Sequence, residues 1–179
     1  MKLRLLPIAL TVIISATLLF GGWFAYRQLA VQGPLQQIVT EYEGVNDVQI
    51  DINPSQVTLK LDLQPETKIS GLVKHISSEG KSIIGDRELK LEVTDKSNEE
   101  IEAWWDQALF VVAEAMENRR YSDIPDTLKV LEESHPEVQA VAEMDDKNVY
   151  IRLSSKEGDA AKFIILPREA GVMGVWNNT

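Results

Sequence analysis

The stretch VQIDINPSQVTLKL, residues 48–61, carries the complete pattern of a β-hairpin. Apolar residues occupy every second position on both sides of Asn53-Pro54-Ser55, a sequence typical of a turn. This alternation predicts two half-buried strands whose apolar side chains share one face. A second stretch, VQAVAEMDDKNVYIRL at residues 138–153, repeats the pattern around the polar turn Asp145-Asp146-Lys147-Asn148. The sequence therefore predicts two similar hairpins in one chain.

The two hairpins share features outside their turns. In each, an acid precedes Val-Gln, at residues 47–49 and again at residues 137–139. A helical pattern comes before each strand pair, with apolar positions at Leu35, Ile38, Val39 and Tyr42 in the first case and at Leu128, Val130 and Leu131 in the second. These features favour duplication of one module, and the alternative is independent convergence of two amphipathic hairpins.

The remaining patterns predict an α+β fold. A helix at residues 67–79 and a third strand at 88–93 make residues 35–95 an α-β-β-α-β module. Residues 96–168 are predicted to contain a long helix at 98–118 and a second, α-β-β-β module. Within it, Ser97 and Glu100 match a capping box at the start of the long helix. The remaining elements of that region are a helix at 126–134 and a third strand at 162–166.

The strand register predicts which side chains are buried. The core-facing residues are expected to be Val48, Ile50, Val57, Leu59 and Leu61 in the first module, and Val138, Ala140, Ala142, Val149, Ile151 and Leu153 in the second. Lys60 and Arg152 should point to solvent. We expect the long helix to lie between the modules and to offer Trp105 and Val112 to both.

The chain begins with a predicted membrane anchor. Residues 5–26 contain no charge over 22 positions, and a helix of that length covers about 33 Å, which is enough to cross a bilayer core of about 30 Å. A cleaved signal peptide is the alternative, but the bulky residues after Gly22 do not match a cleavage site. Residues 1–4 are then a short cytoplasmic N-terminus and residues 27–34 a linker. Lys2 and Arg4 precede the segment, so we expect the C-terminal part to be extracytoplasmic.

Small residues recur every fourth position along one face of this segment, at Thr17, Gly21 and Ala25. Such faces let membrane helices approach one another closely. They predict self-association, although small residues are also common in membrane helices that do not pair.

Composition excludes several functions. The chain carries 18 Lys and Arg against 28 Asp and Glu, for a net charge of −10. An acidic protein repels phosphate backbones, so nucleic-acid binding is not expected. Cysteine is absent, which excludes disulfides and thiolate chemistry.

No motif predicts catalysis or a cofactor. Glu79-Gly80-Lys81-Ser82 resembles the end of a phosphate-binding loop, but His75 stands where that loop needs glycine. The two histidines, His75 and His135, have no partner at a spacing that indicates a metal site. The acids of residues 99–106 are interpreted as a solvated helix face and Asp145-Asp146 as a turn. We therefore expect a protein that is not an enzyme and has neither a cofactor nor a metal.

Trp104 and Trp105 allow two interpretations. Either both belong to a large core, or Trp104 lies at a surface where another protein docks, because Trp is favoured in binding hot spots. The C-terminal residues 169–179, rich in Gly and Asn, are expected to be a loosely attached tail.

Residues 35–93 resemble, in element order and size, the ring-building motif, and also small envelope modules of the BON type. The ring-building motif occurs in membrane-anchored proteins that stack into rings in secretion systems and sporulation channels. This resemblance implies an extracytoplasmic scaffold that binds other envelope proteins. The second module departs from it because no helix separates its last two strands. The alternative function is a sensor or regulator domain that binds a small ligand or peptide.

Overall fold

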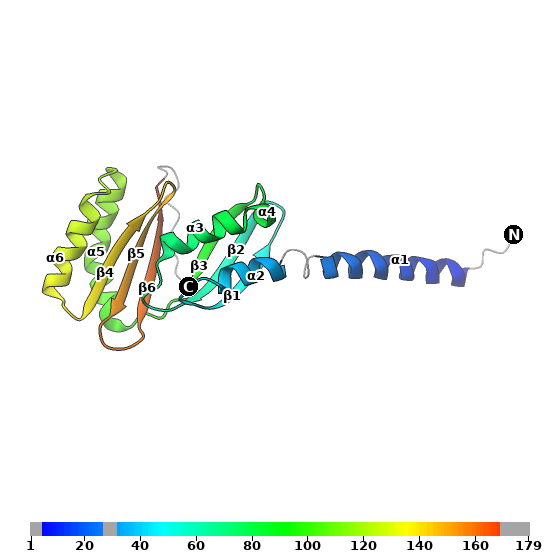
Figure 1. The fold of residues 1–179 in the computed structure, drawn as a ribbon, viewed down its shortest axis with the longest axis horizontal. Helices are drawn as coiled ribbons and strands as arrows, with labels where there is room; N and C mark the ends of the chain where they lie inside the picture. Colours follow the sequence, from blue (N-terminus) through cyan, green and yellow to red (C-terminus); the bar gives the residue numbers. More distant parts are fainter. Residues whose placement is uncertain (1–4, 27–31, 169–179) are drawn as a thin grey trace.

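The structure, a computed structural model, describes residues 5–26 and 32–168. Within the first helix, α1 (Leu5–Tyr26), it describes side chains only for residues 10–22. Figure 1 shows α1 as a rod that is separate from the two sheets. Among the described residues, no helix meets the length and hydropathy that a membrane crossing requires. The membrane anchor therefore stays a prediction.

The first unit, from α2 to β3, is an α-β-β-α-β arrangement, as the sequence predicts. Its elements are α2 (Gly33–Thr40), β1 (Val45–Ile52), β2 (Gln56–Leu63), α3 (Ile69–Glu79), α4 (Lys81–Ile84) and β3 (Glu88–Val93). β1 pairs antiparallel with β2, and β2 pairs parallel with β3 because α3 and α4 carry the chain back across the sheet. The short helix α4 was not predicted.

The core of the first unit lies between the sheet and its helices. The apolar face of the hairpin packs against α2 and α3, where Leu35, Val39, Leu72 and Ile76 are buried. The predicted faces are confirmed here, since Leu59 is buried and its neighbour Lys60 is exposed. Ile50 is only half-buried, because β1 is an edge strand.

The second unit, from α5 to β6, is an antiparallel sheet covered by two helices. Its elements are α5 (Glu99–Glu117), α6 (Asp123–Ser134), β4 (Val138–Met144), β5 (Asn148–Ser155) and β6 (Ala161–Pro167), with strand order β4-β5-β6. The described residues therefore form an α+β fold with two small three-stranded sheets. The predicted third strand at 162–166 is confirmed within β6.

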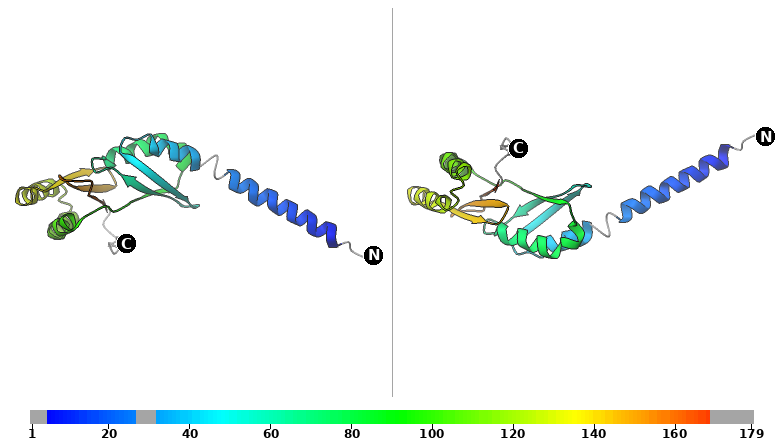
Figure 2. Two further views of the ribbon diagram at one scale, coloured as in Figure 1. Left: turned by 90° about the horizontal axis from the view of Figure 1, so that it is seen from below. Right: turned by 90° about the horizontal axis from the view of Figure 1, so that it is seen from above.

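The long helix α5 does not lie between the two units, so that prediction is wrong. It packs with α6 on one face of the second sheet and contacts β4 and β5 (Figure 2). Trp105 and Val112 therefore contribute to the core of the second unit alone. The apolar stripe of α5 did not show which sheet it would cover, because both sheets offer an apolar face.

Two helix starts differ from the predictions. Asn98, not Ser97, caps α5: its side-chain oxygen accepts a hydrogen bond from the Ile101 amide at 2.9 Å. α6 begins at Asp123 rather than Asp126, so Pro125 lies in its first turn, where the missing amide costs little.

The two hairpins turn in the same way. Asn53 Oδ1 accepts hydrogen bonds from the amides two and three residues later, at 3.0 and 2.7 Å, and Asp145 Oδ1 does the same at 2.7 and 2.7 Å. Aligned on these turns, Val48 corresponds to Ala140 and not to Val138. The repeated acid-Val-Gln sequence thus lies two residues out of register, although both copies keep the same face. Duplication stays a prediction.

The first unit covers the second face of the second sheet. Tyr150 is buried in the first unit's core, and Phe163 and Ile165 pack against it. Arg152, predicted to be in solvent, has a side chain only 13% exposed and donates to the Pro65 carbonyl at 3.2 Å. That prediction is wrong because the first unit occupies the space that the hairpin pattern leaves to water.

A carboxylate of the second unit caps a helix of the first. Lys68, at the start of α3, makes no side-chain cap. Glu143 on β4 supplies it, since its carboxylate accepts a hydrogen bond from the Ser70 amide at 3.1 Å. An acid at a helix N-terminus is favourable because it meets unpaired amides and the positive end of the helix dipole.

Candidate interaction surface

Both candidate tryptophans belong to the core. Trp104 is 2% exposed and Trp105 is 9% exposed, and both belong to the buried stripe of α5. Trp104 Nε1 is buried and has no hydrogen-bond partner among the described residues. Both indoles are therefore in a core, as the first interpretation expects, but that core belongs to the second unit alone. A partner contact through Trp104 or Trp105 stays a prediction.

The small-residue face of α1 is described only in part. Thr17 Oγ1 donates to the Ile13 carbonyl at 2.9 Å, and a Cβ added at Gly21 would meet no atom within 4 Å. The side chain of Ala25 lies outside the described residues. Packing of α1 against a second helix stays a prediction.

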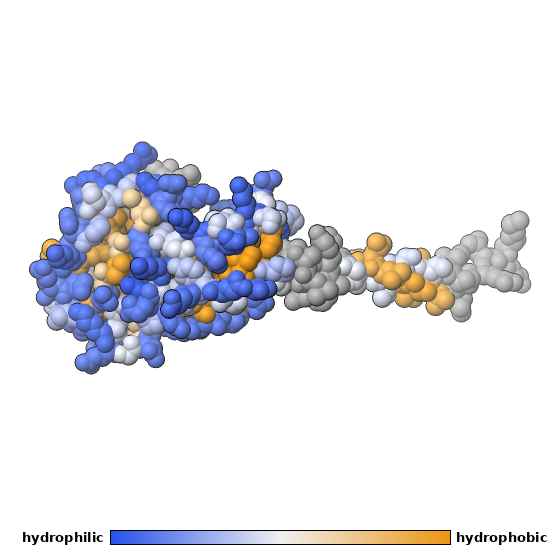
Figure 3. All heavy atoms as spheres, viewed as in Figure 1, coloured by the Kyte–Doolittle hydropathy of each residue, from blue (hydrophilic) through white to orange (hydrophobic). Residues whose placement is uncertain are grey.

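The helices α5 and α6 expose apolar side chains that the sequence did not predict to be exposed. Phe110 was not singled out, and Val130 was grouped with the apolar positions of its helix. Phe110 on α5 is 78% exposed, and Val130 on α6 is 63% exposed. Val111 and Val130 border a hollow of about 380 Å³ between the two helices. A signal was present, because Phe110 follows Ala108 by two residues and so falls opposite the buried stripe. Figure 3 shows a domain surface that is mainly hydrophilic, with hydrophobic patches among the charged side chains.

Acidic side chains surround this surface, which we define as Phe110, Val111 and Val130. Asp106 and Glu114 lie four residues before and after Phe110, so all three share one face of α5. Asp126 borders the hollow beside Val130. The combination is an exposed apolar centre with a negative rim, on a chain that is itself acidic.

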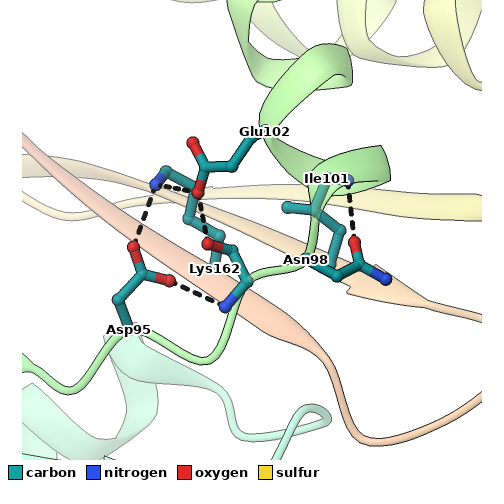
Figure 4. A network of polar contacts seen from close by, with 6 residues as sticks. Asp95, Asn98, Ile101, Glu102 and Lys162 are labelled. Atoms are coloured by element: carbon teal, nitrogen blue, oxygen red, sulfur yellow. Dashed lines mark hydrogen bonds and ion pairs between the residues drawn. The ribbon is translucent and has the colours of Figure 1, made fainter.

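A buried lysine joins the start of α5 to β6. Lys162 Nζ lies 3.1 Å from an Asp95 oxygen and 2.7 Å from a Glu102 oxygen, and its side chain is only 5% exposed (Figure 4). The Ser97 hydroxyl donates to Glu102, and the Ser97 amide donates to Asp95 at 2.8 Å. The network therefore fixes the path of the chain between the two units.

The opposite charges in this network keep Lys162 and Asp95 in their charged forms. Burial alone would lower the pKa of Lys162, but hydrogen bonds to Glu102 and Asp95 outweigh it and raise that pKa. Burial would likewise raise the pKa of Asp95, yet bonds from Ser97 and Lys162 lower it. A lysine held in the charged form cannot act as a nucleophile or general base, so the arrangement is suited to stability.

Other candidate groups already have partners. Asp145 accepts hydrogen bonds from two turn amides and, at 2.6 Å, from the Tyr150 hydroxyl. Burial, and then the bond to Asp145, raises the pKa of Tyr150 above its usual value. His75 Nε2 lies 3.1 Å from the Ile38 carbonyl. Within the described residues, no group of three or more His, Asp or Glu side chains is placed to hold a metal ion.

Comparison with known proteins gives no assignment. No family model matches the chain, and no curated protein or solved structure matches it. The likeness of residues 35–93 to ring-building and BON-type modules is therefore one of element order. Function has to be argued from the surfaces of this chain itself.

The Lys162 network makes a testable contribution to stability. Lys162→Met leaves the carboxylates of Asp95 and Glu102 without their shared partner. We expect the free energy of unfolding to fall by about 1–3 kcal/mol, because the hydrogen bonds from a charged lysine to two carboxylates are lost. Lys129→Met, at an exposed position of α6, should change it by less than about 0.5 kcal/mol. Urea denaturation of the full chain measures both.

The effect of Lys162→Met should depend on pH. Because the pKa of Asp95 is lowered, its contribution is present above about pH 3.9 and is lost as the pH falls through its folded pKa. Because the pKa of Lys162 is raised, its contribution is present below about pH 10.4 and is lost as the pH rises through its folded pKa. The loss should be full between about pH 5 and pH 9. An equal loss at pH 3 would contradict the ion pairs.

Proposed function

We propose that this protein is a single-pass, membrane-anchored, extracytoplasmic scaffold or assembly protein of a bacterial envelope complex, acting by protein–protein interaction. The observation that carries the proposal is the exposed apolar surface on α5 and α6, centred on Phe110 and Val130. A large exposed aromatic side chain among charged neighbours is typical of a protein contact and gives no chemistry to an enzyme.

The partner that fits this surface presents an apolar contact ringed by Lys or Arg. Phe110 and Val130 supply apolar area, and Val111 borders a hollow that a side chain can enter. Asp106 and Glu114 flank Phe110, so a basic rim on the partner would be attracted and an acidic one repelled.

The location rests on α1 and on the charges near it. Residues 5–26 form an uncharged helix, and several apolar side chains along it are exposed, among them Leu18, Leu19 and Phe20. A bilayer would cover such a surface. Lys2 and Arg4 precede the helix and only Arg27 follows closely, which supports a cytoplasmic N-terminus.

The alternative is a sensor domain that binds a small ligand or peptide. A cleft lined by Trp104 and Trp105 between the sheets would favour it. Both indoles are instead buried between α5 and the second sheet, so neither is available to line such a cleft. An exposed apolar helix face supports the scaffold in preference to the sensor.

Topology is tested on intact protoplasts. A protease added outside should remove the domain beyond about Gly33 and leave the anchor, because the domain is on the outer side. Lysed protoplasts serve as the control. If the domain is cut only after lysis, the orientation is reversed.

Binding is tested on the full chain, affinity-tagged and solubilised in detergent from its own membranes. Phe110→Ser with Val130→Ser should reduce the recovered partner roughly thirtyfold, since hot-spot contacts contribute 2 kcal/mol or more. Met144→Ser removes an exposed apolar side chain elsewhere and should leave recovery unchanged. Higher salt should weaken the complex, because a charged rim is screened.

The comparison between variants decides the outcome. Equal recovery with the double variant and with Met144→Ser would contradict docking at this surface. A partner that binds more tightly at high salt would contradict the basic rim.

A further inference from the structure

The outer edge of the second sheet, on β4, has backbone groups with no partner among the described residues. β4 has one neighbour, β5, among the described strands. The Asp145 amide donates to the Asn148 carbonyl at 3.0 Å, and the Lys156 amide donates to the Glu137 carbonyl at 2.9 Å. These bonds place the odd-numbered residues of β4 in the hydrogen-bonding positions. Because these positions alternate, the amides and carbonyls of Ala140 and Ala142 point away from the sheet.

The corresponding edge of the first unit, on β1, has at least one of its outward groups occupied. There the Gln32 side chain donates to the outward carbonyl of Ile50 at 3.4 Å. Aligned on the turns, Val48 and Ile50 stand where the second unit has Ala140 and Ala142. The small residues leave a hollow of about 540 Å³ between β4 and α6, bordered by Leu128. The second unit thus has small residues and a hollow at the positions where the first unit has Val48 and Ile50.

The order of residues in β4 is nearly symmetric. The strand reads VQAVAEM, with Val141 at its centre and alanine on both sides. When two copies of β4 are paired antiparallel with their Val141 residues opposite each other, Ala140 lies opposite Ala142. In the same pairing, Gln139 lies opposite Glu143 and Val138 lies opposite Met144. Because Ala140 and Ala142 both point outward, the amide and carbonyl of each meet those of the other.

We propose that the β4 edge binds the β4 edge of a second copy of this chain, antiparallel about a two-fold axis at Val141. The occupant is a second copy because the symmetric order makes the edge complementary to itself. Pairing satisfies the outward amides and carbonyls, and the small alanines leave room for their equivalents beneath α6.

This pairing goes beyond the proposed function. It uses a different surface from Phe110 and Val130 and needs no other protein. It also joins the second sheet of one copy to the second sheet of the other, which gives one continuous sheet of six strands. Failure of the pull-down with the Phe110 variant therefore leaves it untouched.

The absence of cysteine gives a clean test. In the full chain in its own membranes, Val141→Cys places two thiols across the axis, with Cα atoms about 4.5 Å apart, within disulfide range. Oxidation with copper phenanthroline should give a disulfide dimer on non-reducing gels as the main product. Gln139→Cys lies on the same face of β4, but residue 139 lies opposite residue 143 of the other copy. The two thiols at residue 139 are therefore four residues apart along the strand, about 13 Å. It should give at least tenfold less dimer.

A proline variant tests the backbone pairing. Ala142→Pro removes an outward amide, and proline is tolerated on edge strands. Added to Val141→Cys, it should reduce the dimer at least tenfold while the circular dichroism melt remains cooperative.

Three results would overturn the proposal. One is equal cross-linking at residues 139 and 141, and another is a Val141→Cys thiol that reacts with maleimide but forms no dimer. The third is a disulfide between Val141→Cys and a different protein, which would show that this other protein binds the β4 edge.

Discussion

The fold depends on covering both faces of the second sheet. α5 and α6 cover one face, and the other carries Tyr150, Phe163 and Ile165, whose apolar area is unfavourable to leave fully exposed to water. The first unit covers that face, and its own helices therefore pack near the second sheet. Glu143 can then cap α3, and Arg152 can reach the Pro65 carbonyl. These polar contacts fix the orientation of the two units, while the apolar contacts hold them together.

The periodicity of apolar residues predicted well which strand residues share a face, and poorly what covers each face of a sheet. Lys60 and Arg152 occupy equivalent positions relative to their turns, and alternation alone places both away from the covering helices. Lys60 is exposed and Arg152 is nearly buried, because only one of the two sheets is covered on its second face. A period of two identifies a face but not its neighbour. For the same reason, the apolar stripe of α5 predicted burial and not the partner sheet.

The candidate surfaces were less visible in the sequence. Phe110 was detectable, since it falls opposite the stripe of α5. The β4 edge was not, because strand order is a property of the assembled sheet. Lys162 lies in a strand pattern that gives no sign of Asp95 or Glu102, which are 67 and 60 residues away. Side chains brought together over such distances need the fold to be known first.

The most direct test of the account asks whether the two units unfold as one body. Leu59 is fully buried in the first unit, so Leu59→Ala should lower the free energy of unfolding by about 2–5 kcal/mol. Native-state hydrogen exchange of the full chain then reports each unit separately. If the second sheet needs its cover, amides of β5 should lose the same protection free energy as those of β2, while Lys60→Ala leaves both unchanged. A loss of protection in β2 with β5 unaffected would contradict the account.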